Sequence, residues 1–298
     1  MALPKVSIIM PTYNRAAFIA ESIESIRQQT YGAWELIIVD DGSDDDTEDV
    51  VRNIDDERIR FYKAGRIGIG GAIKNKGLQK ASGEFVAFLD SDDLWAPTKI
   101  EKQIALLNQF PEAGFSLTGG YNFKTPHQSL EYFYKKQTGI KHDRLFLSFF
   151  QSEVPGFTQA LLFRRECLQK TGCFREIKAF SDVDFIATLA YHFNGIILYE
   201  PLVFRRLHER SYSNPNWIKS YYEGVQLIHD FKGKLPPWLF RSALFKLYIN
   251  FGEDFLKGGN RRQAITQFLK AWQYKPFTIV PLKKAGKAIL WRSGLQTS

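Results

Sequence analysis

Cysteine, histidine and long apolar runs are all scarce in this sequence of 298 residues. Two cysteines, Cys167 and Cys173, make neither a disulfide framework nor a zinc knuckle, and we expect them to pack as small apolar side chains. No uncharged apolar stretch approaches the ~20 residues that a membrane-spanning helix needs. The N-terminal residues lead directly into an apolar run and show no pattern of a secretory signal. We therefore expect a cytoplasmic protein.

Acidic residues are scarce in the last third of the chain. Residues 201–298 contain 17 Lys and Arg against 5 Asp and Glu, a net charge of +12, whereas residues 1–200 contain 23 against 27, a net charge of −4. This asymmetry indicates an anionic partner for the C-terminal part. Zinc-finger spacings and RNA-recognition motifs are absent. We therefore expect no nucleic-acid partner, and instead a peripheral contact with the anionic inner face of the cell membrane.

Short apolar runs alternate with helical patterns over about the first hundred residues, which predicts right-handed crossovers and a mostly parallel sheet. Strands are expected at residues 6–10, 34–39, 58–62 and 84–89. Helices are expected at residues 16–29, from 44, at 70–81 and from 97 to about 109. The less regular middle predicts strands at 115–123 and 158–163 and a helix at 181–192.

Beyond Trp217 the sequence shows helical patterns only, which predicts a C-terminal helical appendage. Residues 247–255 and 264–276 flank a Gly-Gly pair and resemble one helical hairpin of a tetratricopeptide-like repeat. In the last predicted helix two faces differ in character: Lys283, Lys284 and Lys287 share one, and Leu282, Ala285 and Ile289 share another.

Two acidic clusters follow two of the predicted strands directly. Asp-Asp-Gly-Ser occupies residues 40–43, and Asp-Ser-Asp-Asp occupies residues 90–93. Ligands of open α/β sheets bind outside the carboxyl ends of the strands, so both clusters are expected in one crevice. Grouped carboxylates favour a hard cation such as Mg²⁺ or Mn²⁺, which is commonly shared with substrate phosphates. Turn and cap chemistry alone is the alternative interpretation.

Individual side chains suit the parts of a nucleotide diphosphate. The carboxylate of Asp41 could accept the N3–H of a uracil-like base, because an ionised carboxyl group only accepts hydrogen bonds. Asp92 or Asp93 could hold a metal against the diphosphate. Lys74 and Arg66 could contact phosphate, although a solvated position explains each of them equally well.

Two later residues are candidates for chemistry. Asp182 stands at the start of a predicted helix, where it is either a general base or a helix-capping carboxylate. His208 follows a strand-like run, where it is either a metal or phosphate contact or a structural residue. A dinucleotide-binding loop is excluded at residues 68–71, because position 73 is Ile where the G-x-G-x-x-G fingerprint needs its third Gly.

Several runs together resemble the family-2 glycosyltransferases, which have the GT-A fold. These runs are VSIIMPTYNR at 6–15, SIRQQTY at 25–31, ELIIVDDGS at 35–43, NKG at 75–77, ASGEF at 81–85 and the DxD-type cluster at 90–93. The resemblance is dense over residues 5–110 and sparse over 155–213. It implies an inverting, metal-dependent transfer of a sugar from a nucleotide-diphosphate donor, with Mn²⁺ or Mg²⁺ as cofactor.

The resemblance also implies roles for particular residues. The base and diphosphate of the donor would be bound by Pro11, Tyr13, Asp41, Lys74, Asp90, Asp92 and Asp93. The metal would be bound by Asp92, Asp93 and His208, and Asp182 would be the catalytic base. One departure is Lys74, where the family usually has Arg; lysine keeps the charge and loses the bidentate fork.

These observations predict an α/β fold of GT-A type, with a mostly parallel sheet between helices. A glycosyltransferase domain is expected at 1–214, made of a Rossmann-like nucleotide-sugar half (1–110) and an acceptor half (111–214), followed by helices at 215–298. The expected donor is a UDP-sugar and the expected acceptor a carbohydrate or lipid-linked hydroxyl, in envelope or extracellular polysaccharide or glycolipid synthesis. The alternatives are an inactive glycosyltransferase-like scaffold and a sugar-nucleotide nucleotidyltransferase.

Overall fold

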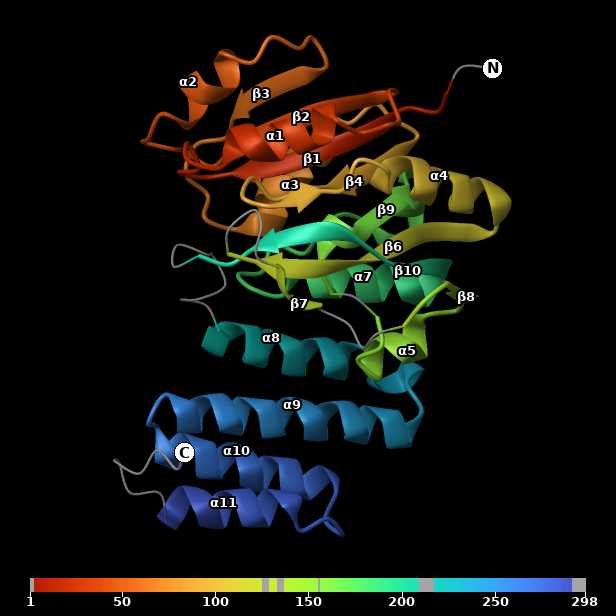
Figure 1. Ribbon diagram of the computed structural model, residues 1–298. Helices are drawn as coiled ribbons and strands as arrows, with labels where there is room; N and C mark the ends of the chain where they lie inside the picture. The colour runs from red at the N-terminus through yellow and green to blue at the C-terminus, as the bar shows by residue number, and fades with distance from the viewer. Residues whose placement is uncertain (1–2, 125–128, 133–136, 155, 209–216, 291–298) are drawn as a thin grey trace. The chain divides into compact units, whose positions relative to one another are not determined.

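The computed structural model describes residues 3–124, 129–132, 137–154, 156–208 and 217–290 (Figure 1). The chain divides into two compact units, residues 1–215 and residues 216–298, and each is described by itself. The first contains the sheet and the second is helical. The division of the first unit into a nucleotide-sugar half and an acceptor half stays a prediction.

Ten strands within the described residues of the first unit form one sheet, in the order β3-β2-β1-β4-β9-β6-β10-β5, with β7 beside β6 and β8 beside β10. The longest ladders, β1 with β2 and β6 with β10, are parallel, and the short strands β5, β7, β8 and β9 pair antiparallel. The bounds are β1 (Val6–Thr12), β2 (Trp34–Asp40), β3 (Ile59–Lys63), β4 (Phe85–Phe88), β5 (Leu94–Trp95), β6 (Ala113–Phe123), β7 (Ser129–Tyr132), β8 (Ile140–Asp143), β9 (Leu161–Arg164) and β10 (Asn194–Arg206).

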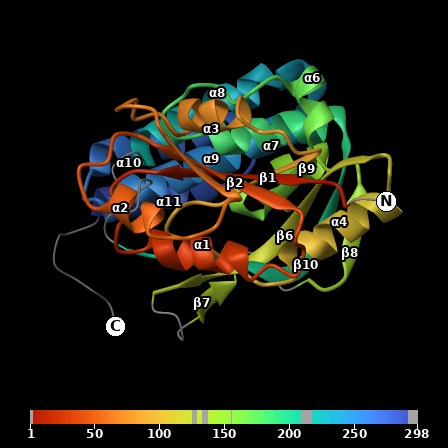
Figure 2. The ribbon, with the colours of Figure 1, turned by 90° about the horizontal axis from the view of Figure 1, so that it is seen from above.

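Helices cover the sheet on both faces, as the strand–helix alternation predicts (Figure 2). They are α1 (Ile19–Arg27), α2 (Thr47–Arg52), α3 (Gly70–Leu78), α4 (Lys99–Gln109), α5 (Phe146–Phe150), α6 (Leu168–Thr171) and α7 (Ser181–His192). Helices α1 and α3 lie on opposite faces of β1 and β2 (Figure 2). Helix α3 approaches β1 closely because Gly77 has no side chain; a Cβ there would collide with Ile9.

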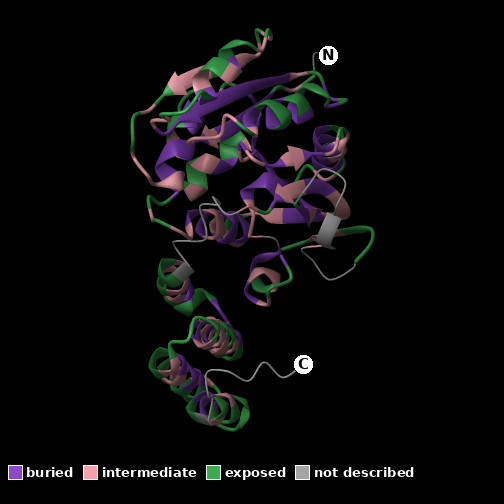
Figure 3. Ribbon diagram, turned by 60° about the vertical axis from the view of Figure 1, so that its left-hand side comes forward, coloured by how far each residue is buried: buried purple, intermediate pink, exposed green. Residues whose placement is uncertain are grey.

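The inner strands are buried on both faces, which explains their continuous apolar sequences (Figure 3). Every residue of β2 and β4 is buried, and β1 is buried except at Pro11. The prediction of a strand over 158–163 is wrong in its first half. Residues Thr158–Ala160 form the 3₁₀ turn η1, because the Thr158 and Gln159 side chains bond to carboxylates, and β9 begins only at Leu161.

The described part of the second unit is helical, as predicted, apart from short turns. It contains α8 (Trp217–Asp230), the 3₁₀ turn η4 (Lys232–Lys234), α9 (Pro237–Lys257), α10 (Arg261–Tyr274) and α11 (Val280–Leu290). Gly259 lies between α9 and α10 with φ 78°, in the left-handed region. Asn260 then caps α10, because its side chain accepts a hydrogen bond from the Gln263 amide. Among the described helices, none combines the length and the apolar character needed to cross a membrane.

The core of this unit lies between its last three helices. It consists of Phe251, Phe255, Ala264, Phe268, Ala285 and Ala288. The single apolar face predicted for α11 is therefore divided: Ala285 is in this core, whereas Leu282 and Ile289 are exposed. The reason is the size of the contact residues, since small alanine side chains let α11 pack closely against its neighbours.

Candidate active site

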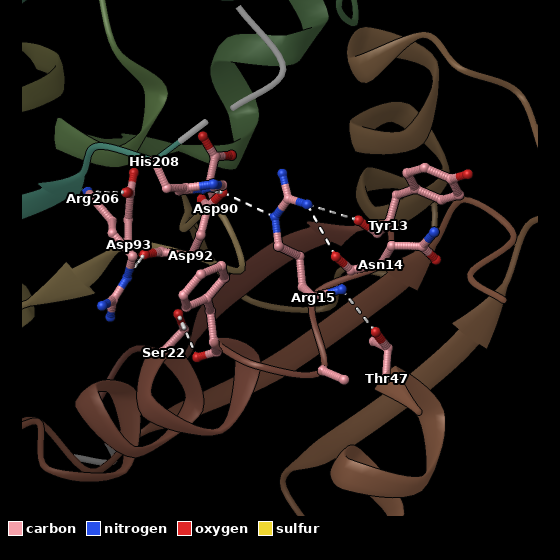
Figure 4. A network of polar contacts seen from close by, with 12 residues as sticks. Tyr13, Asn14, Arg15, Ser22, Thr47, Asp90, Asp92, Asp93, Arg206 and His208 are labelled. Carbon is pink, nitrogen blue, oxygen red and sulfur yellow. Dashed lines mark hydrogen bonds and ion pairs between the residues drawn. The ribbon is translucent and has the colours of Figure 1, made fainter. Parts of the chain in front are cut away.

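The predicted site residues meet at the carboxyl edge of the sheet. Thr12 at the end of β1 pairs with Asp40 at the end of β2, so the segment after β1 and the acidic turn after β2 lie side by side. Strand β4 runs parallel to β1 and delivers Asp90 to the same edge. His208 follows β10 and reaches Asp92 (Figure 4). The parallel pairing of strands that are far apart in sequence thus assembles the cluster.

Asp41 and Tyr13 form one end of this edge. The Asp41 carboxylate accepts hydrogen bonds from the backbone amides of Ile67 and Gly68, at 2.5 and 3.0 Å, and forms an ion pair with Arg66. The Arg66 guanidinium carbon lies 3.7 Å from the centroid of the Tyr13 ring. A flat, delocalised group thus already stacks on Tyr13 beside the Asp41 carboxylate, as a planar base would need to do.

Asp40 and Pro11 support this end from the strands. Asp40 accepts hydrogen bonds from the amides of Gly42 and Ser43, and so it closes the turn instead of facing a ligand. Gly42 has φ 76°, and a Cβ there would lie 2.9 Å from the Arg66 amide nitrogen, so the turn needs glycine. Pro11 lies within β1 opposite Val39.

Asp92 joins the segment after β1 to the segment after β10. Its Oδ2 atom accepts a hydrogen bond from Arg15 Nε at 3.0 Å and lies 3.0 Å from His208 Nε2 (Figure 4). The same arginine donates to the carbonyls of Tyr13 and Asn14, which fixes the loop. Within the described part of the chain, Asp92 Oδ1 has no hydrogen-bond partner. A carboxylate oxygen of Asp92 and the imidazole of His208 therefore lie next to each other in the site.

Asp90 and Asp93 are bridged by Gln159. The Gln159 side-chain amide donates to Asp93 Oδ2 at 2.9 Å and also to Asp90 Oδ2. The other oxygen of Asp93 accepts from the Arg206 backbone amide at 2.8 Å. Both oxygens of buried Asp93 are thus bound by protein groups. The role of Asp93 as a metal ligand stays a prediction, and its contacts favour a part in building the turn.

Burial changes the protonation of these two carboxyl groups. Burial raises the pKa of Asp90 to about 6, with nearby Lys74 opposing the shift and Asp182 and Asp92 adding to it. Burial likewise raises the pKa of Asp93 well above its usual range, and the charges of Asp92 and Asp90 add to the effect. An acidic cluster in this state is stabilised by any positive charge that enters it.

These side chains would bind a divalent cation only when oxygens of the bound substrate complete its set of ligands. Among the residues that the structure describes, no three His, Cys, Asp or Glu side chains are arranged as a ready metal centre. The open Asp92 oxygen, the adjacent His208 and the oxygens of a bound diphosphate suffice for Mg²⁺ or Mn²⁺, since these ions keep water and phosphate oxygens as ligands. The chemistry of the residues therefore agrees with the predicted cofactor.

Asp182 lies in the first turn of α7, and its side chain is 28% exposed. Its Oδ1 atom is 2.6 Å from Lys74 Nζ, and its Oδ2 atom accepts a hydrogen bond from Thr158 Oγ1 at 2.9 Å. The residue at the helix cap is Phe180, and among the described residues no side chain caps α7, so the capping alternative for Asp182 has no support. Lys74, predicted to contact phosphate, is directed at this carboxylate.

Thr158, Gln159, Arg15 and Arg206 contact the predicted site residues, yet sequence reasoning did not single them out. Arg15 stands in the run that carries the family resemblance, which was the available signal. Gln159 and Thr158 lie in a run whose pattern predicts only a strand, so no sequence signal marked them as site residues. For Arg66 the sequence left a phosphate contact and a solvated position equally open, and the structure pairs it with Asp41.

Comparison with protein families gives one match that covers more than half of the chain. The model described as Glycosyl transferase family 2 matches residues 7–172. The match includes β1 from its second residue, β2, β4 and the acidic cluster, and it ends before Asp182 and His208.

Curated relatives are glycosyltransferases by name. An uncharacterised glycosyltransferase of Rickettsia typhi is 34% identical over 228 residues, which are 73% of this chain and 69% of that protein. The UDP-Glc:alpha-D-GlcNAc-diphosphoundecaprenol beta-1,3-glucosyltransferase WfgD of Escherichia coli is 45% identical over 106 residues, 34% of this chain and 40% of the relative. The chain thus spans less than half of WfgD.

Solved structures share the fold. TarS of S. aureus (residues 1–349) in complex with UDP-GlcNAc has a TM-score of 0.70 at 19% identity, covering 91% of this chain and 81% of that one. The mannosyltransferase PcManGT from Pyrobaculum calidifontis, in complex with GDP-Man and Mn²⁺, has a TM-score of 0.60 at 23% identity, covering 97% of this chain and 81% of that one. The predicted GT-A type fold is therefore confirmed.

Proposed function

The chain belongs to glycosyl transferase family 2, and on that premise we propose that it transfers a sugar from a nucleotide-diphosphate donor to a hydroxyl acceptor. One observation carries the proposal: Asp41 with Tyr13, Asp92 with His208, and Asp182 lie at the edge of the sheet where α/β proteins bind ligands. A base site, a diphosphate site and a proton acceptor are the three parts that the reaction requires.

UDP is the nucleotide that we propose for the first part. Tyr13 offers a ring for stacking, and Asp41 offers an acceptor for the N3–H of uracil. Arg66 occupies that space in the free protein, and its side chain is 53% exposed, so a bound base would displace it towards solvent. Support comes from TarS, whose structures contain UDP-GlcNAc and UDP, and from WfgD, whose name specifies UDP-Glc.

Asp92 and His208 would hold Mn²⁺ or Mg²⁺ against the diphosphate. When bound, the cation supplies positive charge that stabilises the leaving nucleotide diphosphate. Asp90 remains at the same edge with a pKa of about 6, so its charge responds to a cation nearby. Arg15 holds the Asp92 carboxylate in place through its Nε atom.

Asp182 is the proposed general base. Its carboxylate accepts the proton of the acceptor hydroxyl, whose oxygen attacks the anomeric carbon from the face opposite the diphosphate, so the configuration inverts. The bond between the anomeric carbon and the diphosphate oxygen breaks, and the nucleotide diphosphate leaves with the bonding electrons.

A lipid-linked carbohydrate is the proposed acceptor class, in envelope polysaccharide or glycolipid synthesis. Support comes from the names of two relatives: WfgD acts on a diphosphoundecaprenol-linked sugar, and a Campylobacter jejuni relative, 47% identical over 98 residues, is named for a PP-undecaprenol acceptor. Such an acceptor lies at a membrane, so the proposal includes peripheral association with the inner face of the cell membrane.

The helical unit supports that association. Its helices expose large apolar side chains near the turn between α10 and α11: Trp272, Phe277, Ile279, Val280 and Leu282. Trp238 at the start of α9 is close to this turn, because Arg241 Nε donates to the Tyr274 carbonyl. We call these six residues the aromatic end. Lys275 and Lys283 are exposed beside it, a combination that suits the interface of an anionic bilayer.

A donor screen tests the proposed activity. Release of UDP from UDP-glucose and UDP-N-acetylglucosamine is measured with Mn²⁺, with Mg²⁺ and with chelator, alongside the melting temperature with UDP. A glycosyltransferase releases UDP slowly from its own donor in the presence of metal, and UDP raises its melting temperature. Stabilisation by UDP without any turnover would favour the inactive scaffold, and formation of a UDP-sugar from UTP and a sugar phosphate would favour the nucleotidyltransferase.

A further inference from the structure

Lys74 is a buried lysine inside the candidate active site. It lies in the middle of α3 with 4% of its surface exposed. Its Nζ atom is 5.9 and 5.6 Å from the ring centroids of Phe88 and Phe174, so aromatic side chains surround the charge. A buried ammonium group needs strong polar partners, because burial removes its hydration.

Two of its partners also contact each other. Lys74 Nζ lies 2.6 Å from Asp182 Oδ1 and 2.9 Å from Thr158 Oγ1, and Thr158 Oγ1 donates to Asp182 Oδ2 at 2.9 Å. Each oxygen of the Asp182 carboxylate is therefore held by a different residue. The three side chains come from α3, η1 and α7 and form a closed triangle, which we call the Lys74–Thr158–Asp182 triad.

We propose that Lys74 and Thr158 are positioning residues for the catalytic base, and that Lys74 acts on transfer through Asp182 rather than through the donor diphosphate. This inference rests on the proposed function, in which Asp182 is the base. The triad fixes the plane of the carboxylate by both oxygens, while a carboxylate has about four lone-pair sites, so acceptor sites remain open for the incoming hydroxyl.

The triad acts on transfer through geometry. Holding the reacting oxygen of Asp182 in place matters for the rate, since a misplacement of about 1 Å can cost roughly a hundredfold. Thr158 is followed by Gln159, which bridges Asp90 and Asp93, so η1 connects the base to the acidic cluster on the donor side.

The test separates binding from transfer in five variants: Lys74→Met, Lys74→Arg, Thr158→Val, Asp182→Asn and the double variant Lys74→Met/Asp182→Asn. Lys76→Met is the matched control, because Lys76 is exposed on the same helix two residues away. Calorimetry measures the Kd of UDP with Mn²⁺, and steady-state assays measure kcat and KM for UDP release from the UDP-sugar that the donor screen identifies.

Lys74→Met should lower kcat on the order of ten- to a hundredfold, with the Kd of UDP unchanged within about threefold. Lys74→Arg should recover part of the loss, Thr158→Val should lose less, and Lys76→Met should match the wild type. In the double variant kcat should fall no further than in Asp182→Asn, because the lysine has no base left to position.

Two results would overturn the inference. One is a large rise in the Kd of UDP for Lys74→Met, which would show a direct phosphate contact. The other is a multiplicative loss of kcat in the double variant, which would show that Lys74 acts independently of Asp182. Failure of the proposed base gives a different result, since Asp182→Asn alone would then turn over at the wild-type rate.

Discussion

Charged side chains at the carboxyl edge of the sheet are paired and largely buried, whereas those of the helical unit are mostly exposed and of one sign. Asp90 and Asp93 share Gln159, and Asp182 has Lys74. In residues 216–298, by contrast, 14 Lys and Arg face only 4 Asp and Glu. The paired, buried charges at the sheet edge hold a few groups in fixed positions, which catalysis requires. The exposed basic residues of the helical unit spread positive charge over a surface, which suits contact with a large anionic partner.

Apolar side chains show the same contrast. In the first unit, Phe88, Phe163 and Phe185 are fully buried and their rings contact one another, Phe163 packing against both of the others. At the aromatic end of the helical unit, large side chains face solvent instead, and Phe277 is completely exposed. Exposed aromatic side chains are expected where another surface covers them. Mutations in the two places should therefore affect different measurements.

Replacement of the base should have the largest effect. Asp182→Asn should lower the transfer rate roughly 10²–10⁴-fold, the usual contribution of a positioned general base. The amide introduced by this substitution keeps an oxygen that can accept from Lys74, so binding of UDP should persist in calorimetry and show that the site is intact. Vesicle binding should also persist. A variant that transfers sugar as fast as the wild type would remove Asp182 from the chemistry.

Charge reversal in the helical unit should weaken vesicle binding and leave turnover unchanged. Lys283→Glu/Lys287→Glu should weaken binding to vesicles containing anionic lipid by about thirtyfold or more, since each basic residue near such a surface contributes about 1 kcal/mol. Turnover with a water-soluble acceptor should stay unchanged. Lys284 is left intact because it forms an ion pair with Glu253.

The matched control for this variant is Arg261→Glu/Arg262→Glu, at the end of α10 away from the aromatic end. Co-sedimentation with vesicles of anionic and of neutral lipid provides the measurement. The control should retain most of the binding, and salt should weaken the wild-type interaction. Equal recovery of the wild type in the supernatant with both kinds of vesicle would mean that the basic surface is only solvated.

Loss of the bridging amide should have a smaller effect on the donor site. Gln159→Met keeps the volume but removes the donor that Asp90 and Asp93 share, so the acidic cluster loses its geometry. We expect Mn²⁺-dependent UDP binding to weaken by roughly tenfold, as for other residues that orient metal ligands. Titration of the variant with UDP and Mn²⁺ measures this, and unchanged affinity would show that the bridge does not matter for the donor.

A carboxylate remote from the site should affect only stability. The hydrogen bonds from Arg58 lower the pKa of Asp56 to about 2, and the residue precedes β3 at the opposite edge of the sheet. A depressed pKa means that Asp56 stabilises the fold above its unfolded value of about 4, and that this stabilisation is lost as pH falls towards 2. Asp56→Asn should therefore cost about 1–2 kcal/mol at pH 7.

Urea unfolding at several pH values checks the Asp56 prediction. The difference between wild type and Asp56→Asn should shrink between about pH 4 and pH 2, and turnover at pH 7 should be equal in both proteins. A constant difference over that range would assign the effect to something other than the charge.

Much of the sheet could be predicted from sequence, for a physical reason. Strands β1, β2 and β4 are buried on both faces, so their sequences are continuous apolar runs that stand out against the helices. Strand β5 has two residues and β8 reads Ile-Lys-His-Asp, so neither shows an apolar run. Turn η1 looks like a strand because the bonds that bend it come from side chains elsewhere in the chain.

The site was predictable where its residues lie at the ends of recognisable elements. Asp41 and Asp90–Asp93 end apolar runs, Asp182 begins a predicted helix and His208 follows a strand-like run; the family resemblance then implied their roles. The pairing of Lys74 with Asp182 joins residues 108 apart in sequence, and that of Gln159 with Asp93 joins residues 66 apart. No local pattern encodes such contacts, because they depend on how α3, η1 and α7 pack.

Calorimetric titration of UDP, with Mn²⁺ and with chelator, into the wild type and Asp92→Ala tests the central claim most directly. The claim is that the carboxyl edge of the sheet is a metal-dependent donor site. The account predicts that the wild type binds UDP far more tightly with Mn²⁺ than with chelator, and that Asp92→Ala binds equally weakly in both conditions. Equal binding by the wild type with and without metal would contradict it.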